Sequence, residues 1–158
     1  MSSKITNFEF ISKQALMAKR IITFLVFVLV TTIFSCNKNN NRIPYVPVDL
    51  YLNTTLPSYS SLNIIGGWVY VSGGSKGIIV YRQTADTFTA YDRHCTYDVN
   101  ANCIPADVDS TNLTITCECD GSQYQIFDGA VINGPATYPL QQYQTSYDDF
   151  TNTLHIYN

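Results

Sequence analysis

Four of the chain's five cysteines lie between residues 95 and 119, and their spacing limits the chemistry that they could do. Cys95 and Cys103 have seven residues between them, and Cys117 and Cys119 have one. Grouped thiolates can bind a metal, whereas cysteines in an oxidising compartment pair as disulfides. A structural zinc site usually uses cysteine pairs with roughly two to four intervening residues. Neither spacing matches, so we do not expect zinc at these cysteines.

The first 35 residues indicate the compartment. Lys19 and Arg20 precede a run of fifteen mostly apolar residues, 21–35, which ends in a serine. This run is shorter than the roughly 20 residues that a membrane-spanning helix needs, and its order of basic, apolar and small residues is typical of a secretory signal. We therefore predict a signal peptide over residues 1–35. Met17 would begin a complete signal by itself, and we expect translation to start there.

The fifth cysteine, Cys36, directly follows this run in the sequence Ile-Phe-Ser-Cys, which resembles a bacterial lipobox. The resemblance implies cleavage before Cys36 and acylation of its side chain. A signal cleaved elsewhere, or a short anchor, would instead make this cysteine incidental. The Asn-rich residues 36–46 cannot bury much surface and suit a polar tether. We expect a lipid anchor to hold residues 47–158 at the membrane of the cell envelope, on its periplasmic side or at the outer membrane.

The distribution of charge argues against a nucleic-acid partner. The chain has a net charge of −3, and four basic residues against one acidic residue give its first 35 residues +3, which leaves −6 for residues 36–158. An acidic body without a stripe of Lys and Arg has no electrostatic reason to bind phosphate backbones. Most of its aspartates are typical of turns, so we expect these to be solvated: Asp86, Asp92, Asp107, Asp109, Asp128, Asp148 and Asp149.

Short strands must position the cysteines. Runs of β-branched and aromatic residues separated by Gly, Asn, Asp or Ser occupy residues 64–74, 76–83, 87–95, 113–119, 123–129 and 153–158. No helical periodicity follows the leader. The alternation of strand-forming runs and turn residues predicts an all-β antiparallel sandwich or partly open barrel. Residues 72–77, which are rich in Gly and Ser, predict a hairpin connection. We interpret Trp68 and the tyrosines as core and sheet-face residues.

The four clustered cysteines allow three disulfide pairings. Cys117 and Cys119 are one residue apart on a predicted strand, so they share a face and cannot easily bond to each other in extended geometry. We expect each to reach back to residues 95–103, and the sequence by itself does not say which cysteine takes which partner.

The order of motifs in the second half resembles a Rieske [2Fe-2S] domain. In that family the first loop reads Cys-Thr-His, the second Cys-Pro-Cys-His-Gly-Ser, and the third contains Gly-Pro-Ala. The matching segments here are Cys95-Thr96-Tyr97, Cys117-Glu118-Cys119-Asp120-Gly121-Ser122, Gly129, Asn133-Gly134-Pro135-Ala136 and Pro139-Leu140. The likeness is clear over residues 91–143 and extends to flanking strands from about 47 to 158. It implies that Cys95 and Cys117 stand at the positions of the two thiolate ligands. It also implies that Cys119 is the non-ligand cysteine, with Cys103 as its disulfide partner.

Both histidine positions of the family motif are changed. A Rieske cluster takes two imidazoles on its second iron, and here Tyr97 and Asp120 occupy those positions. Phenolate and carboxylate oxygens can bind iron, but two potential anions in place of neutral imidazoles should lower the reduction potential and weaken assembly. His94 neighbours Cys95 and should point to the opposite side of an extended loop. We interpret His155, with its apolar neighbours, as a sheet residue.

We therefore expect a cluster-free domain in which Cys95 and Cys117 pair with each other, beside the Cys103–Cys119 disulfide. In the chain-entropy model each disulfide would contribute about 3 kcal/mol. The favoured function is a membrane-anchored, Rieske-like lipoprotein with a binding or structural role toward an envelope protein or ligand. The alternative is a [2Fe-2S] electron-transfer protein in which Tyr97 and Asp120 replace the histidines. No GxSxG or HExxH motif supports an enzyme, and a redox-active form would be an electron-transfer component.

Overall fold

The computed structural model describes Arg20 and residues 42–158. Apart from Arg20, the predicted signal peptide, Cys36 and the first part of the predicted tether lie outside the described residues. Within the described part of the chain, every helix is too short or too polar to cross a bilayer. The residues from Arg42 onward belong to one compact unit.

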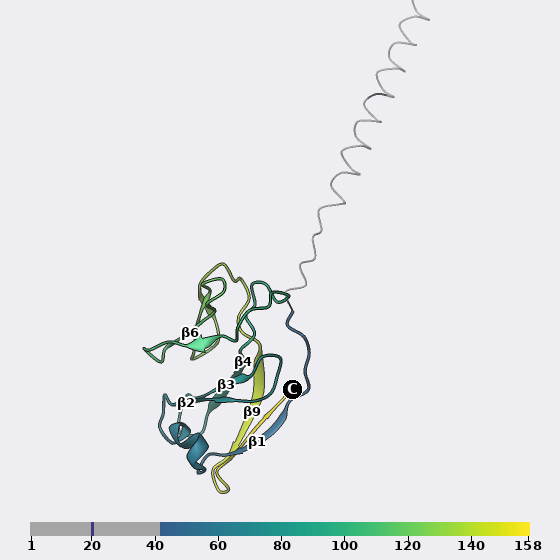
Figure 1. The fold of residues 1–158 in the computed structure, drawn as a ribbon. Coiled ribbons are helices and arrows are strands. Elements are labelled where there is room, and N and C mark those ends of the chain that lie inside the picture. The colour runs from purple at the N-terminus through teal and green to yellow at the C-terminus, as the bar shows by residue number, and fades with distance from the viewer. Residues whose placement is uncertain (1–19, 21–41) are drawn as a thin grey trace, which may run out of the picture. The chain divides into compact units, whose positions relative to one another are not determined.

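Two antiparallel sheets make up this unit (Figure 1). The larger sheet has six strands in the order β1 (Asp49–Asn53), β10 (Thr153–Tyr157), β9 (Gln142–Asp148), β4 (Phe88–Asp92), β3 (Ile78–Arg82) and β2 (Trp68–Val71). The smaller sheet has four strands in the order β5 (Asp107–Val108), β6 (Thr114–Thr116), β7 (Gln123–Gln125) and β8 (Val131–Asn133). A short 3-10 helix, η1 (Pro57–Asn63), connects β1 to β2.

Strands β3 and β4 are buried on both faces, because the side chains of a strand alternate between its two sides. Ile78 and Val80 of β3 pack into one apolar cluster with residues of β1, β9 and β10. Ile79 and Tyr91 point the other way, into a second apolar cluster that contains Cys95, Cys103 and Cys117. These three cysteines therefore belong to the core between the two sheets.

Polar contacts from Tyr70 and Arg93 attach the smaller sheet to the larger one. The Val108 amide of β5 donates a hydrogen bond to the Tyr70 hydroxyl of β2, with 2.9 Å between the two atoms. The Arg93 guanidinium lies over the Tyr70 ring at 3.8 Å from its centroid, and its Nε donates to the Ala106 carbonyl at 2.8 Å. Arg93 also forms an ion pair with Asp107. These contacts fix both ends of the segment that carries Cys95 and Cys103.

The all-β antiparallel architecture predicted from the sequence is confirmed, with a curled larger sheet and a smaller sheet beside it (Figure 1). The four clustered cysteines lie on the loops that connect the strands. The six predicted strand-forming runs contain β2, β3, β4, β6, β7 and β10. Residues 72–77 connect β2 to its antiparallel partner β3, as the hairpin prediction required. The structure adds β1, β5, β8 and β9.

Candidate functional site

Three loops carry the residues of the family motif. The first, residues 93–106, connects β4 to β5, and the second, residues 117–122, connects β6 to β7. The third, residues 134–141, connects β8 to β9. Side-chain hydrogen bonds and disulfides join all three loops, and Thr96 of the first loop is bonded to Tyr138 of the third although the two are 42 positions apart.

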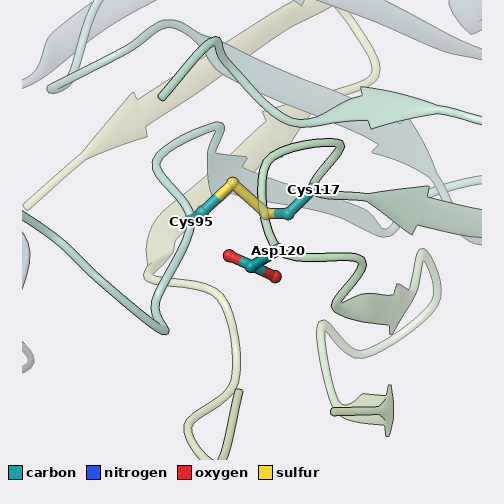
Figure 2. A group of neighbouring side chains, drawn as sticks. All are labelled: Cys95, Cys117 and Asp120. Carbon is teal, nitrogen blue, oxygen red and sulfur yellow. A yellow bond between two sulfur atoms is a disulfide. The ribbon is translucent and has the colours of Figure 1, made fainter. Parts of the chain in front are cut away.

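Two disulfides connect the first loop to the second. Cys95 is bonded to Cys117, with 6.0 Å between the Cα atoms, and Cys103 is bonded to Cys119, with 5.9 Å. The Cys95–Cys117 bond is fully buried, whereas Cys119 is exposed. Figure 2 shows the Cys95–Cys117 bond between the two loops, with the Asp120 carboxylate facing it. The two thiol positions that the family resemblance assigns to one iron thus adjoin each other.

The second loop is a tight turn that closes on itself. The Cys117 amide donates to the Ser122 carbonyl at 2.9 Å, and the Gly121 amide donates to the Cys117 carbonyl at 2.8 Å. Gly121 has a φ of +77°, in the left-handed region that a residue with a side chain rarely adopts. The Ser122 amide also donates to the Asp120 carboxylate at 2.7 Å, which holds that side chain in a fixed orientation.

Buried hydroxyl groups tie the third loop to the other two. The Thr96 hydroxyl donates to the Tyr138 carbonyl at 2.7 Å and is hydrogen-bonded to the Tyr124 hydroxyl at 2.9 Å. The hydroxyl of Ser122, which is fully buried, accepts a hydrogen bond from the Ala136 amide at 2.9 Å. A buried polar group that has its partners resists rearrangement, so these contacts keep the three loops in register.

The prediction that Asp92 is solvated was wrong, because this aspartate is fully buried. It ends β4, and its carboxylate accepts hydrogen bonds from the Ser75 amide at 2.6 Å, the His94 amide at 2.8 Å and the Tyr143 hydroxyl at 2.7 Å. The Lys76 amide contributes a longer bond of 3.3 Å. Several donors stabilise the carboxylate in the interior and fix the backbone just before the first cysteine loop. The turn-like sequence around Asp92 carried no signal of this burial.

His94 is buried, and its ring is hydrogen-bonded on both sides. Its Nε2 is 2.9 Å from the Val99 carbonyl, which can only accept, so Nε2 carries a proton. Nδ1 then accepts from the Ser75 hydroxyl, with 2.8 Å between the two atoms. Burial lowers the pKa of His94, and the Lys76 charge acts in the same direction against the Val99 hydrogen bond. Both ring nitrogens are hydrogen-bonded, so His94 has no nitrogen free to bind a metal beside the cysteines.

His155 lies on β10, as a sheet residue. Its ring stacks on Tyr51 at 4.2 Å and on Tyr157 at 4.5 Å between centroids, and Nε2 is 2.7 Å from an Asp49 carboxylate oxygen. These partners come from the larger sheet alone, so His155 is not part of the cysteine site.

Tyr97 and Asp120 differ in how they relate to the two buried sulfurs. Tyr97 is 47% exposed. Asp120 is half-buried, and one carboxylate oxygen together with the Sγ atoms of Cys95 and Cys117 forms a group whose members all lie within 4.8 Å of one another (Figure 2). Two sulfurs and one carboxylate could hold a metal ion if the disulfide were reduced. In the disulfide form, the same arrangement places a negative charge beside an S–S bond.

A solved structure of a Rieske protein shares this fold. The plasma membrane Rieske protein PetC3 from the cyanobacterium Synechocystis PCC 6803 is 20% identical, with a TM-score of 0.50, and the match covers 64% of this chain and 95% of that one. The ferredoxin of carbazole 1,9a-dioxygenase from Nocardioides aromaticivorans IC177 is 16% identical, with a TM-score of 0.44, over 72% of this chain and 98% of that one. At such identities the first likeness establishes the fold alone.

Residues 61–144 match the family model of the Rieske [2Fe-2S] domain, over slightly more than half of the chain. The chain therefore belongs to the Rieske [2Fe-2S] domain family, as the loop motifs predicted. No curated protein matches the chain.

Proposed function

We propose that this chain is a lipid-anchored member of the Rieske family that binds no [2Fe-2S] cluster and uses two disulfides in its place. Its role would be to bind a partner protein or ligand in the cell envelope, or to support envelope structure. The observation that carries the proposal is the donor set around Cys95 and Cys117, which contains no imidazole.

That donor set does not fit a Rieske cluster. The second iron of the cluster needs two imidazole nitrogens, and the matching positions hold the phenol of Tyr97 and the carboxylate of Asp120. His94 is nearest in sequence, but both of its ring nitrogens are engaged with Ser75 and Val99. The chain's other histidine, His155, lies on the larger sheet with Tyr51 and Asp49. No histidine therefore replaces the missing ligands.

The disulfides supply a structural substitute for the cluster. A cluster held by Cys95 and Cys117 would cross-link the first two loops, and the disulfide cross-links the same two positions. Together with the Cys103–Cys119 bond it restricts the unfolded chain, by about 3 kcal/mol for each closed loop. A small domain could in this way keep its fold without a cofactor. Disulfides persist outside the cytosol, which agrees with the predicted export signal.

A visible absorption spectrum tests the proposal against the alternative, an electron carrier with oxygen ligands. We expect the protein, purified with and without a reductant, to be colourless. Iron and sulfide should also fail to assemble a stable cluster on the anaerobically reduced chain. The Tyr97→His/Asp120→His double variant, which restores both imidazoles, is the matched control in the same reconstitution. A wild-type chain that assembles a redox-active cluster as well as this variant does would contradict the proposal.

The anchoring part of the proposal is tested separately. If Cys36 is acylated, the mature chain begins at this residue and partitions into the membrane fraction, because buried acyl chains contribute about 0.8 kcal/mol per CH₂ group. Replacing Cys36 by Ser should leave an unprocessed or unacylated chain, detected by intact mass. A wild-type chain whose mass shows a different N-terminus and no lipid would overturn the anchor.

A further inference from the structure

We propose that Asp120 protects the Cys95–Cys117 disulfide from reduction by external thiols. The inference rests on the proposed disulfide form of the domain and adds a role for the residue at one of the changed histidine positions. It concerns the charge of the Asp120 side chain rather than its size, and this distinction makes the inference testable.

The position of the carboxylate is fixed by the turn that carries it. An Asp120 oxygen and the two Sγ atoms lie within 4.8 Å of one another, and Figure 2 shows the carboxylate facing the S–S bond. The Ser122 amide holds this carboxylate with a 2.7 Å hydrogen bond. Ser122 is itself fully buried and is bound to the third loop through the Ala136 amide. The negative charge is therefore kept beside the disulfide.

Reduction of this bond would place further negative charge at the same point. Because the bond is buried, the loops must first open enough to admit a thiolate. The thiolate attacks one Sγ, the Cys95–Cys117 bond breaks, and the other cysteine leaves as a thiolate, so that a mixed disulfide forms. A second thiolate then attacks the external sulfur of the mixed disulfide and releases the remaining cysteine. Two electrons pass from two external thiols to the protein, the external thiols become a disulfide, and both cysteine thiolates can take up protons from water. The attacking and leaving sulfurs are negatively charged, so a carboxylate about 5 Å away opposes each step.

Asp120→Asn removes the charge and keeps an oxygen that can accept the Ser122 hydrogen bond. The matched control is Glu118→Gln, which removes the same charge from an exposed side chain of the same loop, outside the group formed by Asp120 and the two sulfurs. Each full-length variant is reduced by glutathione, whose thiolate has a net charge of about −2, and by cysteamine, whose thiolate is close to neutral. Quenching by alkylation and peptide mapping follow the Cys95–Cys117 bond separately from the Cys103–Cys119 bond.

We expect Asp120→Asn to accelerate reduction of Cys95–Cys117 by about tenfold with glutathione and by about threefold with cysteamine. Added salt should reduce the difference between these two accelerations, because it screens the charges. Glu118→Gln should change either rate by less than about twofold. Equal acceleration with both reagents would overturn the inference, because loosening of the loop would act on both alike. An unchanged glutathione rate would overturn it as well. Mapping of the untreated protein separates these outcomes from a failure of the proposed function, which would show as the absence of a Cys95–Cys117 bond before any reductant is added.

Discussion

Removal of the buried disulfide, by Cys95→Ala/Cys117→Ala, should produce a large loss of stability. The bond joins residues 22 positions apart, and the chain-entropy model assigns a loop of this length about 3 kcal/mol. Both side chains are buried in the cluster between the sheets, so the loss of sulfur packing adds to this value. For a domain of roughly 110 residues, 3 kcal/mol corresponds to a fall in melting temperature of roughly 12 °C.

Urea unfolding followed by circular dichroism measures this loss as a free energy of unfolding. The matched comparison is Cys103→Ala/Cys119→Ala, which opens a loop of 16 positions and should also cost about 3 kcal/mol. In addition, single replacement of Cys103 or Cys119 should expose one free thiol at its former partner. If the Cys95/Cys117 variant loses less than about 1 kcal/mol, the disulfide does not hold the loops as we reason.

The Asp92 network and the Lys76 side chain give three further predictions. Gly74→Ala should destabilise the domain by at least about 3 kcal/mol in thermal unfolding, because a Cβ there would lie 2.4 Å from both the Asp92 carboxylate and the Tyr143 hydroxyl, at a φ of +62°. Tyr143→Phe should lower the free energy of unfolding by about 1 to 3 kcal/mol at neutral pH, because the variant lacks the hydroxyl that donates to Asp92. Burial and the Asp92 carboxylate raise the pKa of Tyr143. The stabilisation by the Tyr143 hydroxyl is therefore present below about pH 10 and is lost as the pH rises further. In urea unfolding, the difference in free energy of unfolding between wild type and Tyr143→Phe should shrink above that pH. Lys76→Met should speed amide exchange in the first cysteine loop by several fold, because the Lys76 ammonium donates to the Cys103 carbonyl; an unchanged exchange rate would contradict that role.

The sequence allowed the cysteine loops to be identified because their motif carries unusual residues in a fixed order. The segment from Cys117 to Ser122 departs from the family pattern at two of its six positions, where Glu118 replaces Pro and Asp120 replaces His, and it still forms the tight turn, with Gly121 at positive φ. Strands β3 and β4 were predictable as well, since a strand buried on both faces has apolar or aromatic residues at consecutive positions.

Other elements were not predictable because their stabilising contacts lie far away in the sequence. Strand β9 is rich in Gln, Thr and Ser, and it is a strand because β4 and β10 pair with it on either side. Asp92 was misinterpreted for a related reason. Its donors come from the hairpin at Ser75 and from Tyr143 on β9, and no local pattern indicates that these segments meet.

The most direct test of the central claim is the iron and acid-labile sulfide content of the mature chain, isolated without oxygen from the organism that makes it. We predict less than about 0.1 iron per chain and no labile sulfide, with Cys95 bonded to Cys117. About two iron and two sulfide per chain would contradict the account, because they would show that a cluster assembles without the two imidazoles.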